Sequence, residues 1–138
     1  MEIVPYERAH LDAILALADG VAFSTLVEDP ERAHRVLTAP GAISLVGLED
    51  GEPIGFAHTI TDGAIQAYLC RLLVAPDFQR RGIGRALVDE SLARSGAIRM
   101  DLLSSEEAEP LYRQYSHERW PGYRIFPEGP PGERPDDG

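Results

Sequence analysis

The most constraining feature of the sequence is a turn with two glycines that joins an apolar run to a helical pattern. The run Leu69–Val74 predicts a buried strand, and Pro76 ends it because proline cannot donate to a β-ladder. From Ile83, between Gly82 and Gly84, to Leu92, apolar residues recur at helical spacing. Unpaired N–H groups in a first helical turn attract anions, and glycines let an anion approach the backbone. The sequence therefore predicts a phosphate-binding turn.

The charge of this turn supports the same interpretation. The chain carries a formal net charge of −10, yet Arg80, Arg81 and Arg85 lie within one short turn. A local positive patch on an acidic protein favours an anionic ligand at that place. The alternative is an ordinary solvated helix start.

Two other phosphate-binding motifs fit the sequence less well. A P-loop requires a Gly-Lys pair, and this sequence contains no lysine. A dinucleotide-binding fold requires a third glycine where Leu87 stands, and glycines directly after the strand. At 138 residues the chain is also too short for two mononucleotide-binding halves.

The stretch from Gln79 to Gly84 resembles the pyrophosphate-binding motif Gln/Arg-x-x-Gly-x-Gly/Ala of the GNAT family of N-acetyltransferases, and the likeness extends to the residues on both sides. In that family the turn binds the pyrophosphate of acetyl-coenzyme A (acetyl-CoA), and the preceding strand pairs with the pantetheine arm. The resemblance implies acetyl-CoA as cofactor, and these cofactor-binding residues: Leu72, Leu73, Val74, Gln79, Arg80, Arg81, Gly82, Ile83, Gly84, Arg85 and Ser105.

The segment Ala108–Tyr115 resembles the second cofactor motif of the family, Ala-x-x-Leu/Phe-Tyr. The resemblance makes Tyr112 the catalytic general acid that protonates the departing thiolate of coenzyme A. The segment departs from the family pattern at Ser116-His117, where a Gly-Phe pair is usual, and at Ser105, where an asparagine is common. The alternative role of Tyr112 is packing on an amphipathic helix.

The resemblance implies an enzyme, an acetyl-CoA-dependent N-acetyltransferase that acts on a primary amine of a small molecule or peptide by direct attack on the thioester. An aliphatic amine with a pKa near 10.4 must first lose a proton. Glu28, His58, His117 and a water chain are all candidates for the base. Two alternative functions stay open: a weak or inactive GNAT-fold module that binds coenzyme A or a partner protein, and an unrelated nucleotide-binding domain.

Composition narrows the class of protein further. No apolar run approaches the roughly 20 residues of a membrane helix, so no membrane association is expected. A single cysteine, Cys70, excludes an internal disulfide and favours a cytoplasmic protein. The four histidines lack ligand-like spacing, so no metal site is expected. The acidic balance argues against nucleic acid and favours a cationic or amine-bearing partner.

The pattern predicts a single α/β domain (α+β by some schemes). A short strand is expected at Ile3-Val4. Two Asp-Gly turns predict a three-stranded antiparallel meander. The expected strands are 42–49, 52–61 and 64–74, and the second has Ile54, Phe56, His58 and Ile60 on one face. Helices are expected over 7–19, ended by Gly20, and from Pro30 with Asp29 as N-cap; residues 21–29 are expected to be irregular.

After the glycine turn we expect a helix over 84–95, then a strand over 98–103 parallel to Leu69–Val74, because a helical crossover joins them. A helix capped by Ser104 or Ser105 and running to Tyr115, and a strand over 119–126, complete the expectation. The GNAT-like domain spans 1–127, with a mixed central sheet and helices on both faces, and 128–138 form a disordered tail. Its short C-terminal region leaves room for completion by a second subunit, so a homodimer is one expectation.

Overall fold

A five-stranded mixed sheet forms the centre of the computed structural model, which describes residues 1–19 and 24–129. The strands lie in the order β1 (Glu2–Pro5), β2 (Ala42–Glu49), β3 (Glu52–Thr61), β4 (Gln66–Val74) and β5 (Arg99–Leu102). Neighbours are antiparallel except β4 and β5, which are parallel. The predicted meander and the parallel crossover are therefore confirmed.

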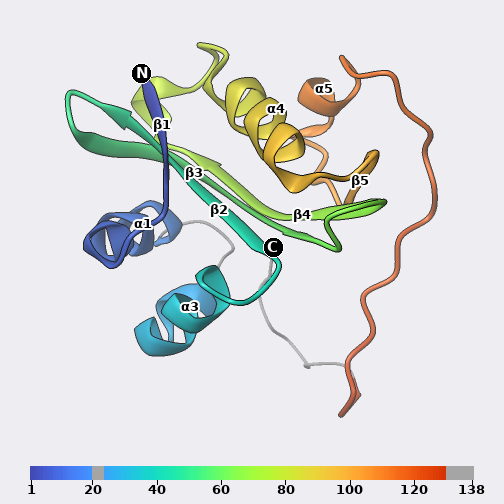
Figure 1. Cartoon of the computed structure of the whole chain (residues 1–138), viewed down its shortest axis with the longest axis horizontal. Helices are drawn as coiled ribbons and strands as arrows, with labels where there is room; N and C mark the ends of the chain where they lie inside the picture. Colours follow the sequence, from blue (N-terminus) through green and yellow to red (C-terminus); the bar gives the residue numbers. More distant parts are fainter. Residues whose placement is uncertain (20–23, 130–138) are drawn as a thin grey trace.

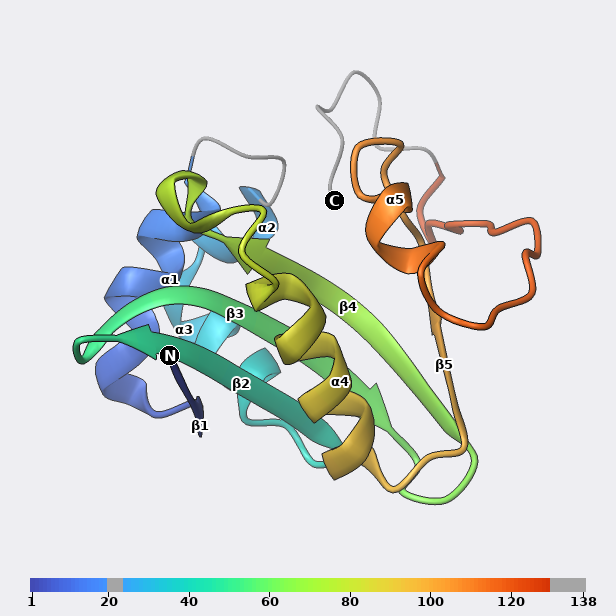
Figure 2. The same ribbon diagram turned by 90° about the horizontal axis from the view of Figure 1, so that it is seen from above.

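Helices cover both faces of the sheet (Figures 1 and 2). One face carries α1 (Leu11–Ala18), α2 (Ser24–Val27) and α3 (Pro30–Leu37), and the other carries α4 (Ile83–Ser95) with α5 (Glu109–Tyr112) beside it. Two short 3-10 helices, η1 (Arg8–His10) and η2 (Pro76–Phe78), precede α1 and the glycine turn. The predicted fold class is confirmed.

Local chemistry fixes the ends of several elements as the sequence predicts. The side chain of Asp29 accepts a hydrogen bond from the backbone N–H of Arg32 at 3.1 Å, which caps α3. Asp50 and Gly51 have φ values of 51° and 80°, as a two-residue hairpin turn requires. The carboxylate of Asp62 accepts three backbone N–H groups in the second turn, which lowers its pKa.

The sheet divides two hydrophobic cores. Phe56 and Leu73 pack with α1, α2 and α3, whereas Ala57 and Leu69 pack with α4. The prediction that Ile54 shares a face with Phe56 is wrong, because Ile54 packs in the core under α4. A register irregularity after Gly47 of β2 interrupts the simple alternation near this end of β3.

Two other predicted elements differ in the structure. Residues 24–27 form α2 within the segment expected to be irregular, because Leu26 is buried in the core. The helix expected to run from Ser105 to Tyr115 is reduced to α5. Pro110 explains the late start, because proline is tolerated only in the first turn of a helix. Gly20, the expected end of the first helix, lies outside the described residues.

The strand expected over 119–126 is not formed, and residues 24–129 contain no strand after β5. Trp120, Tyr123 and Ile125 are 80–86% exposed, so the segment has no apolar face buried against the sheet. A Cβ at Gly122 would meet a methyl carbon of Leu103, so the chain passes close to the end of β5 without pairing with it.

The expected tail falls largely in residues 130–138, outside the described part of the chain, and its disorder stays a prediction. No helix among the described residues has the length and apolar character needed to cross a membrane.

Gly96, at the end of α4, gives a test of this packing. It has φ 71°, and a Cβ there would lie 2.7 Å from the backbone oxygen of Gly63. Gly51 has φ 80° with open space around it, so it is a matched control. We expect Gly51→Ala to lower the free energy of unfolding by about 1–2 kcal/mol from backbone strain alone. Gly96→Ala should lower it by clearly more in urea unfolding; equal losses would contradict the close approach.

Candidate active site

The glycine turn exposes a row of free backbone donors at the start of α4. The N–H groups of residues 80–85 donate no hydrogen bond within the described part of the chain, and the first helical bond runs from Ala86 to the oxygen of Gly82 at 3.0 Å. Gly82 has φ 81° and Arg80 φ 63°, so two left-handed residues orient the turn. Left-handed backbone of this kind forms anion-binding nests. The predicted anion site therefore has the donors it needs.

The remaining residues of the turn have distinct roles. The side-chain amide of Gln79 donates to the carbonyl of Val74 at 3.0 Å, so it ties the turn to the end of β4. Ile83 is buried in the core under α4, so it can offer only its backbone to a ligand. A Cβ at Gly84 would meet Leu111 of α5 at 3.5 Å, which places α5 against the first turn of α4.

The three arginines of the turn are not equivalent. Arg80 and Arg81 are exposed, and the Arg81 guanidinium lies 5.1 Å from the centre of the Phe78 ring. Arg85 instead reaches the segment after α5: it donates to Gln114 at 3.1 Å, and its guanidinium lies 4.0 Å from the centre of the Tyr115 ring. Arg80 and Arg81 are therefore exposed at the turn and can contact an anion, whereas Arg85 contacts Gln114 and Tyr115 of its own chain.

β4 separates from β5 before it reaches the turn. The register with β3 shifts between His58 and Thr59, so Cys70 is an extra residue in β4 without a partner. The parallel pairing ends at Leu69 and Leu102, and the two strands then diverge (Figure 2). The last residues of β4 thus have no strand neighbour on the β5 side. This end of β4 therefore has an unpaired backbone edge on the β5 side, which we call the opening.

The register decides which residues of β4 offer free backbone groups at this opening. Ala75 donates to Ile54 at 2.8 Å, and bonded pairs in antiparallel strands alternate. The backbone groups of Leu73 therefore point to β3, whereas those of Leu72 and Val74 face the opening. Of the three residues expected to pair with pantetheine, only Leu72 and Val74 are suitably placed.

Tyr112 packs at the edge of the core under α4, together with Leu72 and Val74. Burial raises the pKa of its phenol to about 12. The hydroxyl group has no hydrogen-bond partner among the described residues, in contrast to Tyr115, which donates to Asp89 at 2.7 Å. Tyr112 is thus a protonated phenol that packs against the same core as Leu72 and Val74, and a general acid at neutral pH must be protonated.

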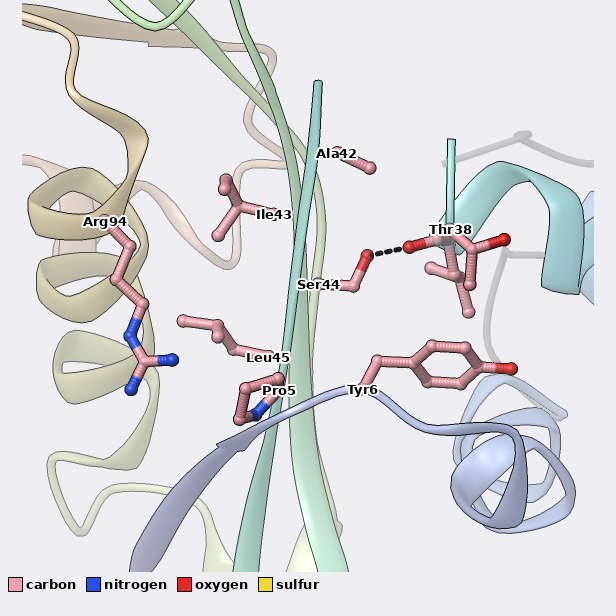
Figure 3. Close-up of a pocket in the computed structure, with 9 residues that line it drawn as sticks. Pro5, Tyr6, Thr38, Ala42, Ile43, Ser44, Leu45 and Arg94 are labelled. Atoms are coloured by element: carbon pink, nitrogen blue, oxygen red, sulfur yellow. Dashed lines mark hydrogen bonds between the residues drawn. The ribbon is translucent and has the colours of Figure 1, made fainter. Parts of the chain in front are cut away.

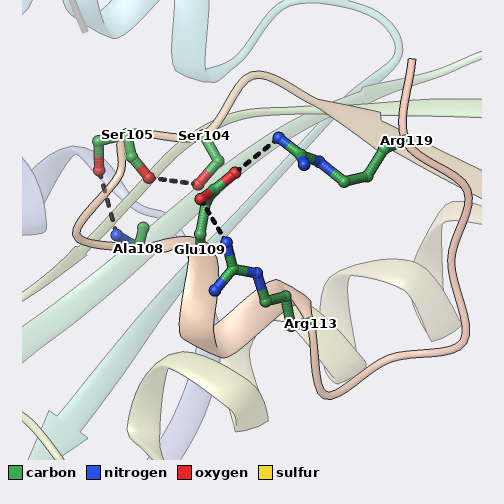
Figure 4. A network of polar contacts seen from close by, with 6 residues as sticks. All are labelled: Ser104, Ser105, Ala108, Glu109, Arg113 and Arg119. Carbon is green, nitrogen blue, oxygen red and sulfur yellow. Dashed lines mark hydrogen bonds and ion pairs between the residues drawn. The ribbon is translucent and has the colours of Figure 1, made fainter.

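Ser105 belongs to the polar network around α5 (Figure 4). Its hydroxyl accepts from the N–H of Ala108 at 3.3 Å, and the carboxylate of Glu109 binds Arg113 and Arg119 at 2.9 and 3.1 Å. Ser105 is therefore a cap for the turn that leads into α5, and its predicted role toward the cofactor stays a prediction.

The three candidate bases are not brought together. Glu28 and His117 are exposed, and His117 uses Nδ1 to donate to the carbonyl of Tyr115 at 2.7 Å. His58 is 2% exposed, and its Nδ1 lies 3.2 Å from a guanidinium nitrogen of Arg71. An arginine can only donate, so Nδ1 accepts and the proton of the neutral ring is on Nε2. His58 therefore has no free nitrogen lone pair with which to act as a base.

Sequence reasoning missed the contact of His58 with Arg71 and the anchoring of Tyr115 by Asp89. The contact of His58 with Arg71 depends on the register shift in β4, and no glycine, proline or other turn residue in the sequence marks that shift. The second could have been sought from the tyrosine three positions after Tyr112, but only the fold brings it to α4.

A separate surface pocket lies at the other end of α4 (Figure 3). Its lining includes Arg94 in the last turn of α4 and the edge residues Ala42–Leu45 of β2. Ser44 there already donates to the carbonyl of Leu37 at 2.7 Å. The pocket is remote from the first turn of α4 and offers no free cluster of polar groups, so the opening beside β4 is the better candidate site.

Comparison with known proteins identifies the family. The model of the acetyltransferase (GNAT) domain matches residues 40–116, more than half of the chain and all of the meander, the glycine turn and α4. The chain belongs to the GNAT family. GNAT acetyltransferases use acetyl-CoA, so the expected cofactor agrees with the family, and the free donors at the glycine turn fit its pyrophosphate.

Two curated relatives are mycothiol acetyltransferases. The protein from Acidothermus cellulolyticus is 34% identical over 107 residues, which cover 70% of this chain and 32% of that protein. The protein from Nocardia farcinica is 38% identical over 86 residues, 62% of this chain and 27% of that protein. This chain thus spans about a third of the length of these relatives or less.

Solved GNAT structures share the fold across most of the chain. The aminoglycoside 6'-N-acetyltransferase of Acinetobacter haemolyticus matches with a TM-score of 0.76 at 16% identity and covers 91% of this chain and 97% of its own. An aminoglycoside N-acetyltransferase in complex with coenzyme A matches with a TM-score of 0.67 at 21% identity and covers 91% and 99%. At these identities the likeness concerns the fold alone.

The buried His58 predicts a measurable pH dependence of stability. Burial, helped by the charge of Arg71, lowers its pKa from 6.5 to about 4. Its contribution to stability is therefore full above pH 6.5 and is lost as the pH falls toward 4. Between pH 7.5 and 5, urea unfolding should lose about 2 kcal/mol more in the parent protein than in His58→Gln. Parallel losses in the two proteins would show that His58 is solvated.

Proposed function

We propose that this GNAT domain is an acetyl-CoA-dependent N-acetyltransferase that transfers an acetyl group to a primary amine of a small molecule or peptide. The observation that carries the proposal is the row of free N–H groups at residues 80–85 beside the unpaired end of β4. The free N–H groups can donate hydrogen bonds to a diphosphate. The unpaired end of β4 can pair with an extended arm that carries amide groups. Arg80 and Arg81 add positive charge at the same turn.

The names of the relatives favour a small-molecule acceptor over a peptide. The curated relatives, two mycothiol acetyltransferases, are named for a small molecule. The likeness does not extend to this acceptor in particular, because the matched regions cover only 32% and 27% of the two curated relatives.

Acetyl-CoA supplies the acetyl group as a thioester. In the proposed reaction the amine nitrogen forms a bond to the carbonyl carbon, the carbon–sulfur bond breaks, and the amine proton passes to water. The backbone N–H groups of β4 at the opening would bind the carbonyl oxygen as negative charge develops there. Tyr112 would give its phenolic proton to the leaving thiolate and regain a proton from solvent.

The second candidate function is a GNAT-fold module that binds coenzyme A without catalysis. The lack of a placed base favours it, because Glu28 and His117 are exposed and His58 is a buried ring with its acceptor nitrogen occupied. Stabilisation by acetyl-CoA without thiol release from any amine would support this function over the enzyme.

Binding at the glycine turn can be tested with a charge substitution and a matched control. Saturating acetyl-CoA should raise the melting temperature of the parent protein by about 5–10 °C. Gly82→Asp should weaken binding at least about tenfold, because it places a carboxylate beside the anion. Gly63→Asp is the control: Gly63 also has a positive φ and open space around it, but it lies in the β3–β4 turn. This variant adds the same charge and should bind acetyl-CoA as tightly as the parent protein does.

An unchanged melting temperature of the parent protein at millimolar acetyl-CoA would contradict the cofactor site. Equal weakening by Gly82→Asp and Gly63→Asp would attribute the effect to net charge rather than to the turn.

The proposed role of Tyr112 predicts a separation of turnover from binding. Tyr112→Phe should lower kcat about a hundredfold and leave the Kd of acetyl-CoA within a factor of about three. Tyr115→Phe is the control, since its hydroxyl is bonded to Asp89; it should lower stability and keep most of the turnover. If Tyr112→Phe turns over like the parent, the proton comes from another group.

A further inference from the structure

The face of the sheet opposite α4 contains an unusual polar pair. His58 of β3 and Arg71 of β4 are direct cross-strand partners, and their nitrogens lie 3.2 Å apart. His58 is 2% exposed, and Arg71 is partly buried. Their neighbours on the same face, Phe56 and Leu73, belong to the apolar core under α1 and α3. A cation and an imidazole thus lie against this core.

Both side chains keep a buried donor without an acceptor. Nε2 of His58 and Nε of Arg71 are buried and have no hydrogen-bond partner in the described part of the chain. Nδ1 of His58 accepts from Arg71, so both unpartnered atoms carry N–H groups. A buried donor left in this state destabilises the fold, and folded proteins rarely tolerate it without a reason. The missing complement is a set of acceptor oxygens.

The charge around Arg71 points to an anion. No carboxylate among the described residues lies within ion-pair distance of this guanidinium, whereas arginines such as Arg8, Arg94 and Arg113 each bind a glutamate. Its electrostatic neighbours are Cys70 and a second cation, Arg124. A partly buried arginine with no carboxylate partner among the described residues is best compensated by a bound carboxylate, which the guanidinium can hold through two hydrogen bonds.

Of this pair, Arg71 lies on the strand that borders the opening between β4 and β5. Arg71 is two residues beyond Leu69, the last β4 residue paired with β5, and one residue before Leu72. The free amides of residues 80–85 are at the start of α4, on the other face of the sheet. With acetyl-CoA bound from the α4 face, the side of β4 that carries Arg71 is the one left for the amine.

We propose that Arg71, positioned by His58, binds a carboxylate of the acceptor, so that the substrate is an amine that also carries an acid group. This inference rests on the proposed acetyltransferase function and refines its substrate class. It replaces the cationic acceptor expected from net charge, because further positive charge beside the Arg71 guanidinium would be repelled. It applies equally to a free amino acid and to the terminal carboxylate of a peptide.

The test compares acids with their amides. Glycine, β-alanine, γ-aminobutyrate and triglycine are each assayed as free acid and as carboxamide, with thiol release as the readout. For the preferred acceptor the parent protein should favour the acid at least about tenfold in kcat/KM. A preference among the single amino acids or for triglycine distinguishes the two sources of the carboxylate.

Two variants and a control locate the effect. Arg71→Gln should reduce the acid-to-amide ratio to near one and leave the Kd of acetyl-CoA unchanged, and Arg71→Lys should recover part of the ratio. Arg99→Gln, on the exposed side of β5, should keep the parental ratio. Equal use of acids and amides by the parent protein, or a ratio unchanged in Arg71→Gln, would overturn the proposal.

A binding measurement separates this proposal from the enzymatic one. If no amine releases thiol, the acetyltransferase function fails, but succinate should still raise the melting temperature of the coenzyme A complex where succinamide does not. Arg71→Gln should abolish that difference. Succinate and succinamide acting alike on the parent protein would overturn the carboxylate site independently of catalysis.

Discussion

The structure depends on a row of backbone donors that the fold itself does not satisfy. A helix start leaves its first N–H groups without carbonyl partners, and here the left-handed residues Arg80 and Gly82 extend that row into the preceding turn. The turn is held to β4 by Gln79 and to the core by Ile83, so the donors are fixed before any ligand arrives. Such preorganisation lowers the cost of binding a phosphate.

A single irregularity in β4 links this site to the rest of the domain. The extra residue Cys70 lies where the pairing of β4 with β5 ends, and it shifts the register toward β3. If the register set by the hairpin continued unchanged, Cys70 would be the partner of His58. The shift makes Arg71 the partner instead. The extra residue thus lies where the opening for the cofactor arm begins, and it also places Arg71 on the opposite face of the sheet, where the acceptor would approach.

Local chemistry made much of the fold predictable. The Asp-Gly turns, the cap at Asp29 and the helical stripe after Gly82 act over a few residues, and each appears in the structure. The predictions for the C-terminal elements were wrong, because Pro110 prevents a helix from beginning at Ser105 and the exposed side chains of residues 119–126 give no apolar face to bury against the sheet. The engagement of Arg85 and the roles of His58 and Arg71 depend on contacts between distant segments, which no local pattern encodes.

The most direct test is an NMR titration of the amide signals of the full chain with coenzyme A. The account predicts saturable shifts concentrated in residues 80–85 and in the two β4 residues that face the opening, Leu72 and Val74, with little change at Gly63. Saturation with shifts concentrated elsewhere, while the amides of residues 80–85 stay unperturbed, would contradict it.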